Sequence, residues 1–223
     1  MTSNSLRYSL YLTLLPPLGA LLNGLYNGPL YRLSPSLFWL ADFVLFVVAP
    51  IFIVSWLAKV AYIHPRDYGL NPASFKGVQL FVTSLLFALI LFAVYEFAKY
   101  VGWMLAWRWY VEPDFSYGTA TPEGLWRPVV VLYWALTAGL MESIFYIGLP
   151  WYLWRNKLGL TRRRHLFLFL SALVFAAVHW EQGVHNAIGA FGFGLAACLL
   201  YWKVNDLWPI VGAHVLVDLY AFS

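Results

Sequence analysis

The sequence predicts an all-α protein, a polytopic transmembrane helical bundle of about seven spans. Its composition indicates lipid surroundings, since 62% of the 223 residues are hydrophobic, only 11% are charged, and the mean hydropathy is +0.69. Seven apolar runs are separated by short stretches that carry charge, proline or glycine. Because each span needs roughly 20 residues, the chain has room for one bundle and for little else.

The apolar runs define the expected helices in chain order. They cover residues 8–27, 37–59, 78–105, 128–154, 166–180, 186–202 and 207–222. The first run is the least regular, because Pro16 and Pro17 interrupt it. In the sixth, Gly192 and Gly194 are expected to allow close packing against another helix. The single cysteine, Cys198, excludes a disulfide within one chain.

The distribution of Lys and Arg orients the predicted bundle, because cationic loops remain cytoplasmic. Segments 59–77 and 155–165 are basic, whereas loop 108–127 carries Glu112, Asp114 and Glu123. We therefore expect the N-terminus to be cytoplasmic and the C-terminus outside. The short chain, in which we find no organelle signal, favours an integral protein of the bacterial plasma membrane. Topology and anionic lipid headgroups account for the net charge of +4. The lipid bilayer is thus an expected partner and nucleic acid is not.

Ionisable residues at membrane depth carry the functional information, because each costs several kcal/mol in hydrocarbon and is usually paired or functional. They are Asp42, Glu96, Glu142, His179, His214 and Asp218. Asp42 is interpreted as an interfacial residue near the outer start of its run. Glu96 is interpreted as the partner of Lys99 in a local ion pair.

The remaining four residues are expected to share one depth. Counting helical rise from the cytoplasmic ends of their helices puts Glu142 at ~20 Å and His179 at ~22 Å, with His214 and Asp218 at ~12 and ~18 Å. Three helices would therefore bring two carboxylates and two imidazoles to one slab of the membrane. We predict that these four residues meet in a single pocket.

Spacing within the helices supports a shared pocket, since residues four apart lie on one helix face. Phe175 and His179 form FxxxH in "VFAAVHW", and His214 and Asp218 form HxxxD in "LWPIVGAHVLVD". Together with Glu142 in "ESIFYIG", this ordered set resembles the CPBP family of intramembrane proteases, which includes CAAX prenyl proteases and abortive-infection-like proteins. The resemblance covers roughly residues 128–222. It divides the chain into N-terminal helices of undefined role, 1–127, and a CPBP-like catalytic region, 128–223.

The glutamate motif departs from the family pattern EExxFRG and fits it in two registers. If Glu142 is the second glutamate, Met141 replaces the first and Tyr146 replaces the arginine. If Glu142 is the first, Ser143 and Ile147 replace the second glutamate and the arginine. We prefer the latter register, because it removes an intrahelical ion pair as a unit and leaves no unpaired charge in lipid.

The resemblance implies an intramembrane endopeptidase that cleaves a membrane-associated protein or peptide. Glu142 and His179 would act on the attacking water, and His214 and Asp218 on the oxyanion. A glutamate in an apolar cavity suits such acid and base chemistry on physical grounds too. No cofactor is expected. Zinc is an alternative, because two histidines and a carboxylate are donors that it prefers.

Each of these catalytic assignments has an alternative in which the residue has only a structural role. Glu142 would also serve as a hydrogen-bonding residue between helices, His179 as part of an interfacial turn, and Asp218 as an outer-face residue. His179, Glu181 and His185 form a second, outer candidate for a metal site. At the level of function, the alternatives are a non-catalytic CPBP relative that acts as a maturation or immunity factor, and a proton-coupled transporter.

Overall fold

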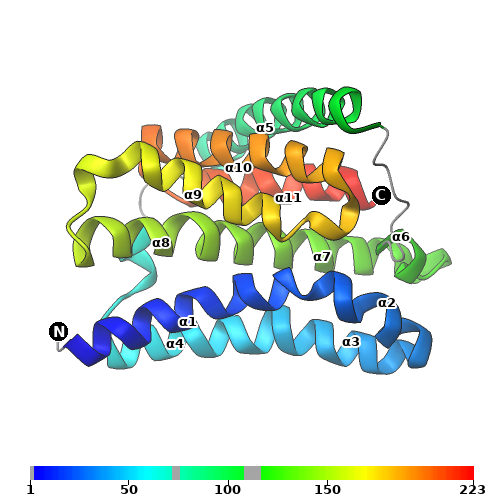
Figure 1. The fold of residues 1–223 in the computed structure, drawn as a ribbon, viewed down its shortest axis with the longest axis horizontal. Helices are drawn as coiled ribbons and strands as arrows, with labels where there is room; N and C mark the ends of the chain where they lie inside the picture. Colours follow the sequence, from blue (N-terminus) through cyan, green and yellow to red (C-terminus); the bar gives the residue numbers. More distant parts are fainter. Residues whose placement is uncertain (1–2, 72–75, 108–116) are drawn as a thin grey trace.

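The computed structural model describes residues 3–71, 76–107 and 117–223, and within these ranges every regular element is helical (Figure 1). The main helices are α1 (Ser3–Leu21), α2 (Asn23–Leu33), α3 (Pro35–Phe43), α4 (Ala49–Val60), α5 (Gly77–Ala106), α6 (Tyr117–Ala120), α7 (Arg127–Glu142), α8 (Leu149–Tyr152), α9 (Arg164–Ala177), α10 (Val184–Val204) and α11 (Trp208–Phe222). The described residues also include the π-helical stretches η1 (Val44–Val48), η5 (Ser143–Gly148) and η6 (Leu153–Lys157), and the 3₁₀ turns η2 (Pro65–Tyr68), η4 (Gly124–Trp126), η7 (Thr161–Arg163) and η8 (Trp180–Gln182). The predicted all-helical class is confirmed.

Each predicted apolar run is helical over most of its length, and α1 continues through Pro16 and Pro17. In the described ranges, four helices are long and apolar enough to cross a membrane: Pro35–Val60, Gly77–Ala106, Gly124–Lys157 and Val184–Val204. Helix α11 is apolar but shorter. The chain is an integral membrane helical bundle, while the count of seven spans and the orientation of the termini stay predictions. Glu112 and Asp114, on which the orientation partly rests, lie outside the described residues.

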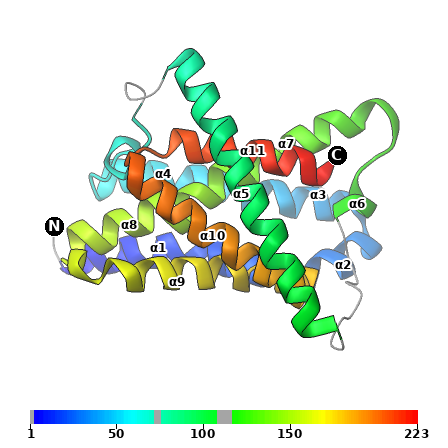
Figure 2. The ribbon, with the colours of Figure 1, turned by 90° about the horizontal axis from the view of Figure 1, so that it is seen from above.

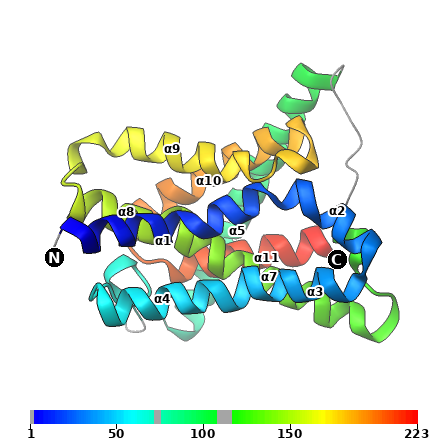
Figure 3. The same ribbon diagram turned by 60° about the horizontal axis from the view of Figure 1, so that its bottom comes forward.

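The helices pack around the long segment that contains α7 and α8 (Figure 1). Helices α1 to α4 lie along one side of this segment, and α9, α10 and α11 lie along the other, with α5 outermost. Seen from above, α5 crosses α10 and α11, and it packs against both (Figure 2). On the N-terminal side α1 contacts α4, α9 and η5 (Figure 3). The segment from α7 to η5 is therefore enclosed from both sides.

Small residues allow α7 and α11 to approach closely. A Cβ at Gly139 would lie 2.6 Å from Cγ2 of Val215 and 2.9 Å from its backbone nitrogen. Glu142 follows Gly139 by one helical turn and His214 directly precedes Val215, so this contact brings the two predicted site residues together. Gly192 serves a similar purpose on α10, where a Cβ would lie 2.9 Å from that of Ala98. The expected packing role of this glycine is confirmed.

Gly139→Ala is expected to destabilise the bundle by about 1–3 kcal/mol, because the added methyl group overpacks the contact with Val215. Gly19→Ala is the matched control, since its Cβ would meet only Leu45, at 3.9 Å. There the higher helix propensity of alanine should leave stability unchanged or slightly raised. Thermal unfolding in detergent compares the two variants. Equal unfolding temperatures would contradict the close approach of α7 and α11.

Candidate active site

Glu142 lies at the end of α7, where the helix widens into the π-helical stretch η5. Such π-bulges often occur at functional sites. Pro150 follows the stretch and has no N–H to offer the carbonyl four residues earlier, which belongs to Tyr146. The hydroxyl of Ser171 on α9 donates a hydrogen bond to that carbonyl instead. The irregular backbone after Glu142 is thereby tied to the helix that leads to His179.

His214 is the centre of the predicted cluster. Its Nε2 lies 3.5 Å from Oε2 of Glu142 and 3.6 Å from Oδ2 of Asp218, so one imidazole nitrogen faces two carboxyl groups. His214 and Asp218 are four residues apart on α11 and share a face, as their spacing predicts. All three side chains are largely buried: 6% of the His214 side chain is exposed, 19% of Glu142 and 14% of Asp218.

His179 directly follows the last turn of α9, and its Nδ1 lies 2.7 Å from the backbone oxygen of Phe175. A carbonyl oxygen only accepts hydrogen bonds, so Nδ1 carries the proton and donates it. In the neutral ring Nε2 is then an acceptor. The FxxxH spacing thus has a local physical role, because the backbone of its first residue sets the tautomer of its last.

Aromatic rings form the apolar wall beside the two histidines. The ring centre of Phe193 on α10 lies 4.6 Å from that of His214, and Phe175 lies 4.7 Å from His179. Phe175 and Phe193 stack on each other at 5.6 Å. Their rings restrict the orientations of both imidazoles and keep this side of the cluster apolar.

One cavity of about 90 Å³ reaches all four predicted residues, Glu142, His179, His214 and Asp218. Its remaining lining residues are Ala20, Asn23, Asp42, Phe46, Tyr117, Trp134, Thr137, Ala138, Val178, Glu181, Gln182 and Phe222. Among the described residues, no Lys or Arg lines it. The cavity draws on both halves of the chain, because α1, α2, α3 and η1 supply part of its wall.

The positions at which the glutamate motif departs from the family pattern are buried. Ser143 is fully buried with an unpaired hydroxyl, and Ile147 is 5% exposed. A Cβ at Gly148, the motif glycine, would lie 2.7 Å from the backbone oxygen of Tyr68, so that glycine permits close packing. In the preferred register a charged pair would therefore sit in a dry environment, and the uncharged replacements avoid its desolvation cost.

Two further acidic residues line the cavity that were not predicted to belong to the central site, although Glu181 was part of the outer metal candidate. Asp42 was interpreted as interfacial but is 5% exposed, and the hydroxyl of Tyr133 donates a 2.7 Å hydrogen bond to its Oδ2. Glu181, in the turn η8, lines the cavity from the end of α9. Burial raises the pKa of Glu181 to about 7, so this carboxyl group ionises near neutral pH. A lone Asp in an apolar run was the available signal for Asp42.

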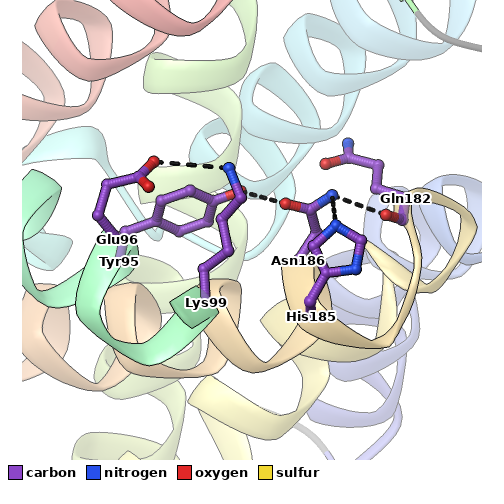
Figure 4. Close-up of polar contacts among 6 residues, drawn as sticks. All are labelled: Tyr95, Glu96, Lys99, Gln182, His185 and Asn186. Atoms are coloured by element: carbon purple, nitrogen blue, oxygen red, sulfur yellow. Dashed lines mark hydrogen bonds and ion pairs between the residues drawn. The ribbon is translucent and has the colours of Figure 1, made fainter. Parts of the chain in front are cut away.

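Polar contacts between α5 and α10 hold the turn that follows His179 (Figure 4). The hydroxyl of Tyr95 donates to Oδ1 of Asn186 at 3.0 Å, and the amide of Asn186 donates to the backbone oxygen of Gln182. The predicted ion pair between Glu96 and Lys99 is confirmed at 3.6 Å. Through Asn186, the end of η8 is therefore tied to α10 and to α5.

The residues that the structure describes contain no group of three or more His, Cys, Asp or Glu arranged to hold a metal ion. This holds for the central cluster and for the outer candidate of His179, Glu181 and His185.

The fold and the cavity define a class, that of polytopic helical membrane proteins with carboxyl and imidazole groups gathered inside the bundle. Comparison with protein families narrows this class to one family of proteases. Residues 124–220 match the family model for type II CAAX prenyl endopeptidase Rce1-like proteins, a protease family. The match confirms the predicted resemblance to CAAX-type proteases and covers the segment from η4 to α11. No curated protein and no solved structure matches the chain.

Proposed function

We propose that this protein is an intramembrane endopeptidase that hydrolyses a peptide bond in a membrane-associated protein or peptide. The observation that carries the proposal is the contact of His214 with both Glu142 and Asp218 in one largely buried cavity. The match of residues 124–220 to a protease family supports it independently.

In the proposed reaction, the Glu142 carboxylate removes a proton from a water molecule whose oxygen attacks the peptide carbonyl carbon. Collapse of the tetrahedral intermediate breaks the C–N bond. The proton held by Glu142 passes to the leaving nitrogen, so the products are a carboxylic acid and an amine and Glu142 is regenerated. The π-helical stretch η5 begins directly after Glu142 and holds the backbone of this residue in place for both proton transfers, from water and to the leaving nitrogen.

The histidines have separate proposed roles. Nε2 of His179 accepts a hydrogen bond from the attacking water, because Nδ1 is committed to Phe175. Nε2 of His214 lies farther from both carboxyl groups than the ordinary length of a hydrogen bond. It is therefore free to donate to the carbonyl oxygen of a substrate as negative charge develops there. Asp218 faces the same nitrogen at 3.6 Å and is proposed to act with His214 on the oxyanion.

The experiment that tests this function uses wild-type protein in lipid nanodiscs and a library of membrane-anchored peptides, analysed by mass spectrometry. We expect fragments that end at defined sequence positions. Proton-dependent uptake by liposomes without any peptide cleavage would favour the transporter. Binding of library peptides without cleavage would favour a non-catalytic relative, for which the replaced motif residues Ser143 and Ile147 are the argument.

A metal-free reaction predicts resistance to chelators. Cleavage in nanodiscs should change less than twofold after incubation with EDTA or 1,10-phenanthroline, because carboxyl and imidazole groups perform every proposed step. The measurement is the initial rate before and after chelation and again after addition of zinc. Loss of activity that zinc alone restores would contradict the metal-free mechanism.

A further inference from the structure

Asp42 occupies an unusual position for a carboxylate in an apolar helix. It is nearly fully buried, and the hydrogen bond to its Oδ2 comes from Tyr133, a neutral group. Among the ion pairs of the described residues, none includes Asp42. A buried carboxylate without a cationic partner is costly in a membrane, and such residues usually mark a binding site or a pathway.

The cavity that Asp42 lines is the one that contains Glu142 and His214. Glu181 adds a second carboxyl group to its lining, and no cation does so among the described residues. The cavity therefore offers a buried carboxylate to a cation, and a peptide that carries a basic side chain supplies one.

Distance along α7 relates Asp42 to the catalytic end of the cavity. Tyr133, which binds Asp42, precedes Glu142 by nine residues, or ~13 Å of helical rise. An extended peptide covers that length in about four residues. A long basic side chain spans part of this distance itself, so the basic residue would then lie only about two or three residues from the scissile bond.

We propose that Asp42 binds a lysine or arginine side chain of the substrate, two to four residues from the scissile bond, and that it thereby determines cleavage specificity. The proposal rests on the proposed endopeptidase function and adds a substrate class to it. Asp42 lies on α3, outside the matched segment 124–220, so this specificity comes from the N-terminal helices.

The test uses membrane-anchored peptides in which each position around the cleaved bond carries Lys, Arg, Gln or Glu in turn. Wild type in nanodiscs should prefer Lys or Arg over Gln at one position, measured as a ratio of kcat/KM values. In Asp42→Asn, which retains an acceptor for Tyr133, that ratio should fall by about 10- to 100-fold, the range for a hydrogen bond to a charged group. Glu96→Gln is the matched control, since Glu96 is 45% exposed and does not line the cavity. Its preference should equal that of wild type.

The outcomes separate this proposal from the function on which it rests. Cleavage by wild type with no preference for a basic residue would overturn the role of Asp42 and leave the endopeptidase function standing. An equal loss on Lys and Gln peptides in Asp42→Asn would also overturn it, because a merely structural residue has that effect. Failure of wild type to cleave any peptide of the set would contradict both.

Discussion

Glu142→Gln is expected to lower kcat/KM for peptide cleavage by at least about 10³-fold while the protein remains folded in the membrane. Glutamine is nearly isosteric with glutamate but accepts no proton from water, so the variant loses general-base catalysis, which contributes about 10²- to 10⁴-fold. His214 lies 3.5 Å from Glu142, which is longer than a hydrogen bond, so their contact does not require a charge on Glu142. Purified wild type and variant are compared on the same peptide in nanodiscs, with unfolding temperature as the measure of folding.

Glu123→Gln is the matched control for this prediction. Glu123 is exposed, directly precedes the turn η4 and does not line the cavity. Its replacement should change kcat/KM less than twofold. If Glu142→Gln retains more than a tenth of wild-type activity, Glu142 is a structural residue between helices, and the base must be sought elsewhere in the cavity.

His214→Ala is expected to have the second largest effect, a decrease in kcat of roughly 10²- to 10³-fold with little change in KM. The reason is loss of the N–H that stabilises the oxyanion, since a donor of this kind acts in the transition state more than in the bound substrate. His214 also lies between two carboxyl groups, so the substitution removes the group that separates Glu142 from Asp218. Steady-state kinetics on one peptide distinguish the effects on kcat and KM.

His165→Ala supplies the control for the histidine substitution. His165 is exposed near the start of α9, and its ring centre lies 6.2 Å from that of Trp202. It does not line the cavity. Its replacement should leave both kinetic constants close to those of wild type. A rise in KM with unchanged kcat in His214→Ala would assign this histidine to substrate binding and contradict the oxyanion role.

Helical periodicity and membrane depth predicted that Glu142, His179, His214 and Asp218 share one cavity, and they do. The HxxxD spacing places His214 and Asp218 on one face of α11, and Glu142 reaches the same depth on a different helix. That Glu142 lies within 3.5 Å of His214 was beyond prediction, because it depends on the close approach of Gly139 to Val215. This approach is a property of two helices whose contacting residues are far apart in sequence.

The contribution of the N-terminal helices was missed for the same reason. Asp42 is separated from Tyr133 by 91 residues, and no local pattern joins them. Hydropathy placed Asp42 near the outer start of a span and therefore favoured an interfacial position. Packing of η1 against α7, and of Trp39 on α3 against Trp134 on α7, buries the residue instead. In the irregular backbone after Glu142, the carbonyl of Tyr146 accepts a hydrogen bond from Ser171, 25 residues away in sequence, and no local pattern joins these two residues either.

The central claim is that a water molecule activated by Glu142 hydrolyses a peptide bond inside the bundle. The measurement that tests it most directly is cleavage of one peptide in water enriched in ¹⁸O, by wild type and by Glu142→Gln, with mass spectrometry of the fragments. The account predicts that wild type releases a fragment with one ¹⁸O atom in its new C-terminal carboxyl group, and that Glu142→Gln releases none. Labelled fragments formed at equal rates by both proteins, or wild-type fragments without the label, would contradict it.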